Sequence, residues 1–189
     1  MIRPRPSGFC YSAADLHVMQ RDIDLMLAHG ADGIVLGVLQ ETGQVDVPRC
    51  GQLLRQVGDR PVVFHRAFDV TPDPVVALEQ LIDLGVRRVM TSGQEPSAFQ
   101  GAATIAELIR RAAGRVEILP AAGINCSTAR DVIARTGCNQ IHASLRGRRH
   151  DHSTATRPRI SFGNIGPGDE EHFDITDTAA VAEMRALLR

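Results

Sequence analysis

The sequence predicts an α/β fold of the TIM-type (β/α)-barrel class, in one domain that spans residues 1–189. Short apolar runs alternate with segments of helical periodicity, and the connections between them are short, which favours a parallel sheet covered by helices. Several apolar runs also end in ionisable or hydroxyl residues, as barrel strands do at their active-site ends. The chain holds six strand-helix units, whereas a closed barrel has eight, so we expect an incomplete barrel. The alternative is an open doubly wound sheet, although no GxGxxG motif follows the first strand.

The expected helices carry apolar residues at helical spacing and recognisable start and stop signals. Ser12 can cap the first helix, with Asp15 three residues later. Pro74 suits the first turn of the third helix, and Gly85 ends it. The helices are expected at 15–29, 48–57, 73–84, 98–113, 128–136 and 178–188. The strands are expected at 1–5, 34–39, 62–68, 88–91, 116–119 and 140–146, and a polar loop at 147–174.

The composition excludes several classes of chemistry. The chain has 189 residues, 43% of them hydrophobic, and a formal net charge of -1, so neither a nucleic acid nor a membrane is expected as a partner. All 21 basic residues are arginines, which excludes a Schiff-base lysine and a P-loop lysine, and we expect no nucleotide cofactor. The four cysteines show no CxxC spacing, which is typical of reduced thiols in a cytoplasmic protein.

The run at 62–69 carries the first candidate for polar chemistry. Read as a strand with a period of two, it places His65 and Asp69 on one face at the carboxyl end, where both can face the barrel mouth. An imidazole oriented by a carboxylate suits general acid-base catalysis or metal binding. The alternative is a purely structural hydrogen bond between the two. Arg66 falls on the other face, where we expect it to pair with a carboxylate behind the strand.

The run at 140–146 carries the second candidate. His142, Ser144 and Arg146 alternate with apolar residues, so the three polar side chains are expected to face the interior of the barrel, with His142 as a further catalytic candidate. Together with Arg3 and Arg5 they would give a rim rich in positive charge, which suits a phosphate or a carboxylate. The alternative is that these arginines neutralise glutamates supplied by the missing strands of the incomplete barrel.

Three further segments carry side chains that can bind ligands. Ser92 and Gly93 end a strand, where they can offer hydroxyl and backbone donors to an anion or can cap the next helix. Cys10 lies in the first loop after a strand, near the expected mouth, so it is the thiol that we consider for a metal. The His-Asp-His segment at 150–152 lies among arginines in the polar loop, and we expect it to be solvated.

Five segments resemble the CutC copper-homeostasis family in order and spacing. They are MIRPR at 1–5, GADG at 30–33, FHRAFD at 64–69, LG at 84–85 with TSG at 91–93, and HASLR at 142–146. The resemblance implies an eight-stranded barrel in which this chain supplies strands 3–8 and begins inside the third strand. It also implies copper homeostasis and the binding of copper(I). The proposed thiolate ligands of the family lie in its first two strands, and none of the four cysteines here takes their place by motif.

The turn PAAGI at 120–124 departs from the PGGGI-like turn of that family. Alanine resists the positive φ angles that glycine adopts readily, so Ala121 and Ala122 are expected to prevent the turn from forming an anion-binding nest.

Two functions follow from these observations, and whether the chain is an enzyme stays open. The first is a role in copper homeostasis with copper(I) binding, as the resemblance implies. The second is a barrel enzyme that acts on a small anionic metabolite through His65, Asp69, His142 and Arg146. The expected partner is a metal ion or a small anion. A homo-oligomer is also possible, because an incomplete barrel leaves two strand edges unpaired.

Overall fold

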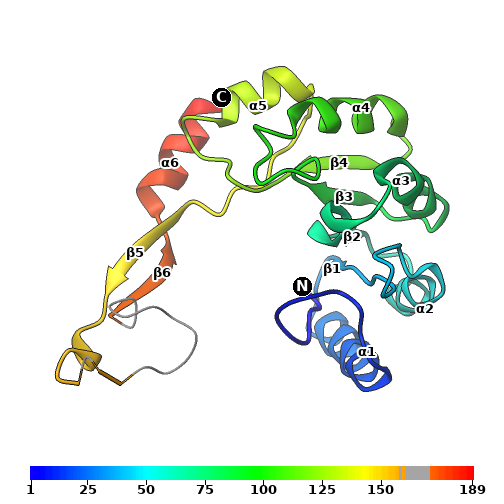
Figure 1. The fold of residues 1–189 in the computed structure, drawn as a ribbon, viewed down its shortest axis with the longest axis horizontal. Coiled ribbons are helices and arrows are strands. Elements are labelled where there is room, and N and C mark those ends of the chain that lie inside the picture. Colours follow the sequence, from blue (N-terminus) through cyan, green and yellow to red (C-terminus); the bar gives the residue numbers. More distant parts are fainter. Residues whose placement is uncertain (158, 161–170) are drawn as a thin grey trace.

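The computed structural model describes residues 1–157, 159–160 and 171–189. A four-stranded parallel sheet, in the order β1-β2-β3-β4, forms its centre. The strands are β1 Ile34–Leu36, β2 Val62–Phe64, β3 Arg88–Thr91 and β4 Glu117–Pro120. The sheet curves in an arc with helices along its outer side (Figure 1). The described part is therefore an incomplete (β/α) barrel, as the alternation of strands and helices predicts.

The six helices lie where the sequence predicts them. They are α1 Ala13–Ala28, α2 Val47–Val57, α3 Pro74–Asp83, α4 Ala102–Ala112, α5 Ala129–Thr136 and α6 Thr178–Leu187. The capping box of α1 is confirmed, because Ser12 Oγ accepts from the backbone N–H of Asp15 and the Asp15 carboxylate accepts from the backbone N–H of Ser12. Helix α4 begins four residues later than expected, since the backbone N–H of Ala98 donates to the carbonyl of Ala122 instead of entering the helix.

The side chains of the sheet divide between two apolar clusters. Val62, Phe64, Val89 and Ile118 belong to the large core that also includes residues of the helices. On the other face of the sheet, Met90, Leu119 and Ala121 form a smaller cluster with Val63 packed against it. Burial of both faces explains why the strands read as continuous apolar runs rather than as alternating patterns.

Two of the expected strands do not join the sheet, so it has four strands among the described residues rather than six. At 1–5 only the backbone N–H of Ile2 donates to the sheet, to the carbonyl of Val35 at 2.8 Å. Pro4 lacks the N–H that would continue this pairing. At 140–146 a single bridge joins His142 to Ala121, beside the edge of β4. Both edges of the sheet are thus partly covered, and the expected self-association stays a prediction.

The segment expected as a loop at 147–174 contains regular structure. Strand β5, Arg146–His150, pairs antiparallel with β6, His172–Thr176, and the short 3-10 helix η2, His152–Thr154, follows β5. We call β5, η2 and β6 the arm, because they extend away from the sheet (Figure 1). The prediction failed because the pairing partners lie more than 20 residues apart. Residues 158 and 161–170 of the expected loop lie outside the described residues.

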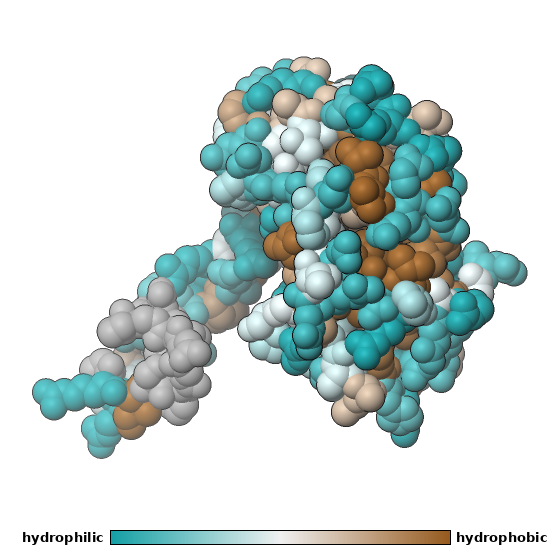
Figure 2. Space-filling model, turned by 45° about the vertical axis from the view of Figure 1, so that its right-hand side comes forward, coloured by the Kyte–Doolittle hydropathy of each residue, from teal (hydrophilic) through white to brown (hydrophobic). Residues whose placement is uncertain are grey.

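Apolar side chains also reach the surface of the main body, by which we mean the sheet and the helices outside the arm. Exposed examples are Leu25 and Met26 of α1 and Val76 of α3. Figure 2 shows apolar patches on one face of the main body, surrounded by hydrophilic surface. No helix within the described ranges has the length and apolar character needed to cross a membrane.

Candidate functional site

The chain turns at the carboxyl end of β2, where the sequence predicts a continuing strand. Strand β2 ends at Phe64, and a 3-10 helix, η1 Arg66–Val70, follows at once. His65 caps this helix, since its Nδ1 accepts from the backbone N–H of Ala67 at 3.2 Å. The period of two therefore stops at Phe64, and the prediction that His65 and Asp69 share a strand face is wrong. No described hydrogen bond or ion pair joins them, and their catalytic roles stay predictions.

The imidazole of His65 is buried on the inner side of the sheet, with 4% of the residue exposed. Its ring lies 5.0 Å from the ring of Phe9. It also lies against Gly37, where an added Cβ would be 2.6 Å from Nδ1, so the glycine that follows β1 makes room for this ring. The pKa of His65 is lowered to about 4, mainly by burial, and the nearby positive charge of Arg3 acts in the same direction.

The hydrogen bond to Nδ1 determines the tautomer of His65. Because Nδ1 accepts, the neutral ring carries its proton on Nε2. This buried Nε2 has no hydrogen-bond partner among the described residues. At neutral pH His65 is therefore an uncharged donor rather than a general base. Buried polar atoms are nearly always paired, so an unpaired donor here indicates a place for a water molecule or a ligand acceptor.

The hydroxyl of Tyr11, in the segment that precedes α1, is a second buried polar atom. It also has no hydrogen-bond partner in the part of the chain that the structure describes. Burial raises its pKa, although the charges of Arg3 and Arg5 act in the opposite direction. Both arginines hold the segment in place, because Arg3 donates to the carbonyl of Ser7 and Arg5 to that of Cys10. Their expected role in binding an anion stays a prediction.

Asp69 is a buried carboxylate surrounded by donors of its own chain, with 7% of its side chain exposed. Its Oδ1 accepts from the hydroxyl of Thr91 at 2.5 Å and from the backbone N–H of Ser92 at 2.9 Å. The backbone N–H of Gly93 donates to the Thr91 hydroxyl at 2.8 Å. The backbone donors that we expected Ser92 and Gly93 to offer to an external anion are thus engaged within the protein.

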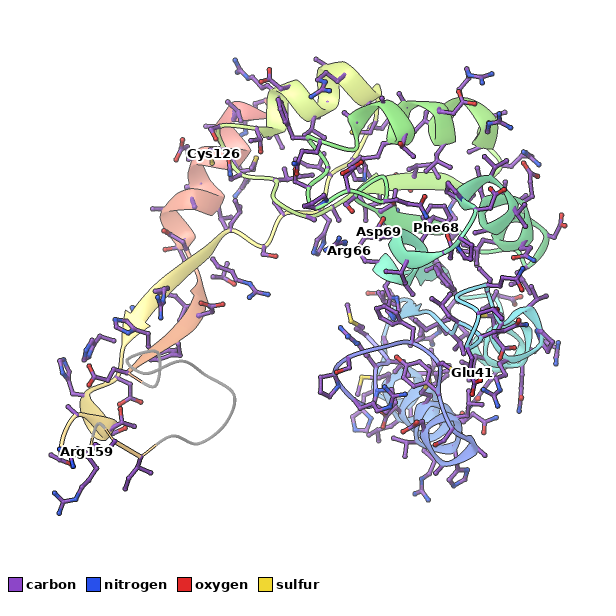
Figure 3. All side chains as sticks on the ribbon, in the orientation of Figure 1. Glu41, Arg66, Phe68, Asp69, Cys126 and Arg159 are labelled. Carbon is purple, nitrogen blue, oxygen red and sulfur yellow. The ribbon has the colours of Figure 1, made fainter. Side chains whose placement is uncertain are left out.

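Arg66 lies at the barrel mouth and not behind the strand. It does pair with a carboxylate, but the prediction of its position is wrong. Its Nε donates to Asp69 Oδ2 at 2.7 Å and its Nη2 to Ser92 Oγ at 3.1 Å. The side chain is 43% exposed, and Figure 3 shows it beside Asp69, directed toward the concave side of the arc. Within the described ranges no hydrogen bond uses Nη1. The guanidinium is therefore held in one orientation and still presents donors outward.

His142, Ser144 and Arg146 line a different cleft. The predicted alternation is confirmed, because these three residues are exposed and the apolar residues between them are partly buried. A cleft of about 590 Å³ lies between this segment, residues 122–127 and α6. Arg146 pairs with Asp174 of β6 at 2.8 Å. No described contact links the cleft to Arg66, so the structure does not bring the four residues of the expected enzyme site together.

The turn after β4 contains an alanine with a positive φ angle, although alanine resists this region. Ala122 has a φ of 81° and Gly123 a φ of 66°. A non-glycine residue in this region costs roughly 1 kcal/mol. The hydrogen bond from Ala98 to the carbonyl of Ala122 helps to hold the strained turn.

The four thiols do not form a metal centre in the described structure. Cys50 is fully buried, and burial raises its pKa to about 12, so it stays protonated. Cys126 donates to the carbonyl of Ala180, and burial together with Glu183 raises its thiol pKa. Cys10 is half-buried in the first loop. Among the described residues, no three His, Cys, Asp or Glu side chains form a group able to hold a metal ion.

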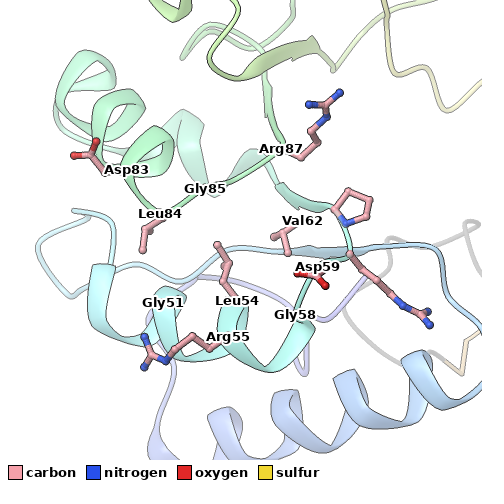
Figure 4. A pocket seen from close by; sticks show the side chains of 12 residues that line it. Gly51, Leu54, Arg55, Gly58, Asp59, Val62, Asp83, Leu84, Gly85 and Arg87 are labelled. Atoms are coloured by element: carbon pink, nitrogen blue, oxygen red, sulfur yellow. The ribbon is translucent and has the colours of Figure 1, made fainter.

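A large cavity lies at the opposite end of the sheet. It has a volume of about 850 Å³ and is lined by the carboxyl end of α2, the segment that leads into β2, and the turn after α3 (Figure 4). Ligands of barrel proteins bind at the carboxyl ends of the strands, whereas this cavity lies at the amino ends. We therefore place the candidate site at Arg66 and not in this cavity.

The fold and the site define an incomplete (β/α) barrel with an oriented arginine at the carboxyl ends of its strands. Residues 1–147 match the model of the CutC family, and the chain belongs to this family. A CutC family protein of Treponema denticola is 43% identical over 189 residues, which are 100% of this chain and 76% of that protein. A human protein named as a copper homeostasis protein cutC homolog is 36% identical, over 100% of this chain and 69% of its own length.

A solved structure shows the same fold. The crystal structure of a CutC protein from Streptococcus agalactiae superposes with a TM-score of 0.72 and 32% sequence identity. The superposition covers 75% of this chain and 69% of that one. The predictions of the family and of the barrel class are thus confirmed.

Sequence reasoning missed two features of the site. It placed Arg66 behind the strand because it continued the period of two past Phe64. The spacing of three residues between Arg66 and Asp69, typical of a pair on one helical turn, was the available signal. It also gave no role to Tyr11, whose burial depends on contacts that no local pattern reveals.

Proposed function

We propose that this chain shares the copper-homeostasis role that the names of its relatives carry, and that its barrel mouth binds a small anion, a phosphate or a carboxylate, through Arg66. The observation that supports the anion site is the guanidinium of Arg66, which Asp69 and Ser92 hold from one side and which is 43% exposed on the other. A planar guanidinium with fixed orientation suits oxyanions, because it can donate two parallel hydrogen bonds.

The charge balance around Arg66 is compatible with an anion. The negative charge of Asp69 is offset by three donors within 2.9 Å, from Thr91, Ser92 and Arg66 itself. The neutral His65 follows β2 directly, and its ring lies 5.0 Å from the ring of Phe9. Its Nε2 is buried, so we assign the first contact with a ligand to the exposed Arg66.

The anion site predicts that Arg66→Gln weakens the binding of inorganic phosphate about tenfold or more, because a hydrogen bond to a charged group contributes roughly 1.5–3 kcal/mol. Isothermal titration calorimetry at low ionic strength measures this affinity for the full chain. Arg66→Lys is expected to restore little of it, since an ammonium cannot reproduce the planar pair of donors.

Arg110→Gln is the matched control, because Arg110 is an exposed arginine that pairs with Glu107 on α4. We expect this variant to bind phosphate like the unchanged chain. Equal phosphate affinity of Arg66→Gln and the unchanged chain would contradict the anion site.

Copper(I) binding is the second candidate function, and the names of the relatives favour it. Copper(I) prefers thiolate ligands. Cys50 is buried and protonated, whereas Cys10 is half-buried in the first loop near the mouth, so we assign Cys10 as the thiol that would contribute.

Competition with a chromophoric copper(I) chelator tests this assignment. We expect Cys10→Ser to lower the copper(I) affinity at least tenfold, and Cys126→Ser, which removes another half-buried thiol, to leave it unchanged. The same affinity for all three chains would show that Cys10 holds no copper(I).

A further inference from the structure

One face of the arm carries exposed apolar side chains. In an antiparallel pair, residues directly opposite each other place their side chains on the same face. Phe173 of β6 is opposite Arg149 of β5, and Ile175 is opposite Gly147, so the two apolar side chains share a face with one arginine. Phe173 is 48% exposed and Ile175 is half-buried. Within the described ranges, the guanidinium of Arg149 has no hydrogen bond or ion pair.

The arm is supported mainly by the pairing of its own two strands. It extends away from the sheet as a separate two-stranded unit (Figure 1). Such a unit is at best marginally stable in water, because it has no second layer against which to bury side chains. The connection between the two strands is longer than 20 residues, so its closure costs more entropy than a tight turn. A partner that covers the apolar face would therefore stabilise the arm.

Helix α1 carries an exposed apolar stripe at the other end of the molecule. Val18, Leu25 and Met26 are exposed, and their spacing of seven and eight residues places them on one side of the helix. Asp22 lies within this stripe, whereas Arg21 lies at its margin. Among the described residues, the carboxylate of Asp22 has no hydrogen bond or ion pair. The stripe thus combines apolar side chains with one unpaired negative charge.

We propose that the arm of each chain docks on α1 of a second copy, so that two chains exchange arms in a twofold-symmetric dimer. In this dimer Phe173 and Ile175 cover the apolar stripe of α1, and Arg149 pairs with Asp22 of the partner subunit. The two surfaces are complementary, because each combines apolar side chains with one charge and the charges are opposite in sign. Phenylalanine and arginine are also enriched at protein interfaces.

A second copy of the chain fits both surfaces at once. The arm and α1 lie at the two ends of the arc (Figure 1), so they do not meet within one chain. A twofold axis that brings the arm of one chain to α1 of the other also forms the reciprocal contact. The apolar surface is thus covered at two places for a single loss of translational freedom. Such an assembly is closed, because it leaves neither an arm nor a stripe on α1 uncovered.

Sedimentation velocity of the full chain over a range of concentrations tests the proposal. We expect a monomer-dimer equilibrium, and at least a tenfold increase in the dissociation constant for Phe173→Asp and for Leu25→Asp, since each places a carboxylate in the apolar contact. Val76→Asp is the matched control, because Val76 is an exposed apolar residue of α3 outside the proposed contact. It is expected to dimerise like the unchanged chain.

Exchange of the two charges tests the pairing separately from the fold of the arm. Arg149→Asp and Asp22→Arg are each expected to raise the dissociation constant, because each places like charges together. The double variant restores opposite charges, so its dissociation constant is expected to approach that of the unchanged chain.

Three results would overturn the proposed dimer. They are a chain that stays monomeric at every concentration, equal dissociation constants for Leu25→Asp and Val76→Asp, and a double charge variant that dimerises no better than the single variants. The dimer does not depend on the anion site, and Arg66→Gln is expected to dimerise like the unchanged chain. Failure of the dimer is therefore distinguishable from failure of the anion site.

Discussion

Replacement of Asp69 by alanine is expected to destabilise the chain by about 3 kcal/mol. The carboxylate is buried and accepts from Thr91, Ser92 and Arg66, which all lose their acceptor in the variant. Removing one partner of a buried charged pair commonly costs about 3–5 kcal/mol, and the exposure of Arg66 places the expected loss at the lower end. Urea unfolding at pH 7 measures the difference in the free energy of unfolding.

Two variants make this result interpretable. Asp69→Asn keeps the shape and one acceptor, so it should recover part of the loss. Glu79→Ala removes a carboxylate that pairs with Arg115 on the surface, and it should change the stability little. If Asp69→Ala were as stable as Glu79→Ala, Asp69 would not organise the mouth.

Loss of Asp69 should also weaken phosphate binding, because it frees the guanidinium of Arg66 to rotate.

Acidification from pH 7 to pH 4 is expected to remove roughly 3 kcal/mol of stability through His65 alone. The pKa of His65 falls from 6.5 to about 4 on folding. Between these values the unfolded chain binds the proton and the folded chain does not, so stability is complete above pH 6.5 and declines as the pH falls. The free energy of unfolding, measured by urea at several pH values, reports this loss.

The effect of His65 is isolated by comparison with His65→Asn, which keeps an acceptor for the backbone N–H of Ala67 but does not titrate. This variant is expected to be less stable at pH 7 and to lose less stability on acidification. His17→Ala, which removes an exposed histidine, should follow the profile of the unchanged chain. Parallel profiles for His65→Asn and the unchanged chain would contradict the burial of a neutral imidazole.

Local signals predicted most of the framework of this fold. The capping box of Ser12 and Asp15 marks the start of α1. Pro74 begins α3, and Gly85 follows its end. The strand expected at 88–91 has the same bounds in the structure. These elements are predictable because their start and stop signals lie within a few residues of the element itself.

The candidate site was less predictable because its determinants are distant along the chain. Asp69 turns away from the expected strand because Thr91 and Ser92, more than 20 residues later, supply its donors. Gly37, directly after the neighbouring strand β1, makes room for the ring of His65. Neither contact is visible in a local sequence pattern. The alternation of a strand therefore predicts that β2 continues past Phe64, whereas tertiary contacts make the chain turn there.

The run at 140–146 shows the same distinction. The predicted alternation is present, because the polar residues are exposed and the apolar residues between them are partly buried. It did not predict that Arg146 begins a new pairing with Thr176 of β6, because that partner lies 30 residues away. Periodicity therefore predicts which side chains of the segment share a face, but it does not predict the strand with which the segment pairs.

Crystals of the chain soaked with tungstate, an oxyanion of the same shape as phosphate, test the anion site most directly. The anomalous signal of tungsten locates the ion without ambiguity. We expect a peak within hydrogen-bonding distance of the Nη atoms of Arg66, and its loss in crystals of Arg66→Gln. Tungstate bound only at other exposed arginines such as Arg110, with none at Arg66, would contradict the proposal that the barrel mouth binds an anion.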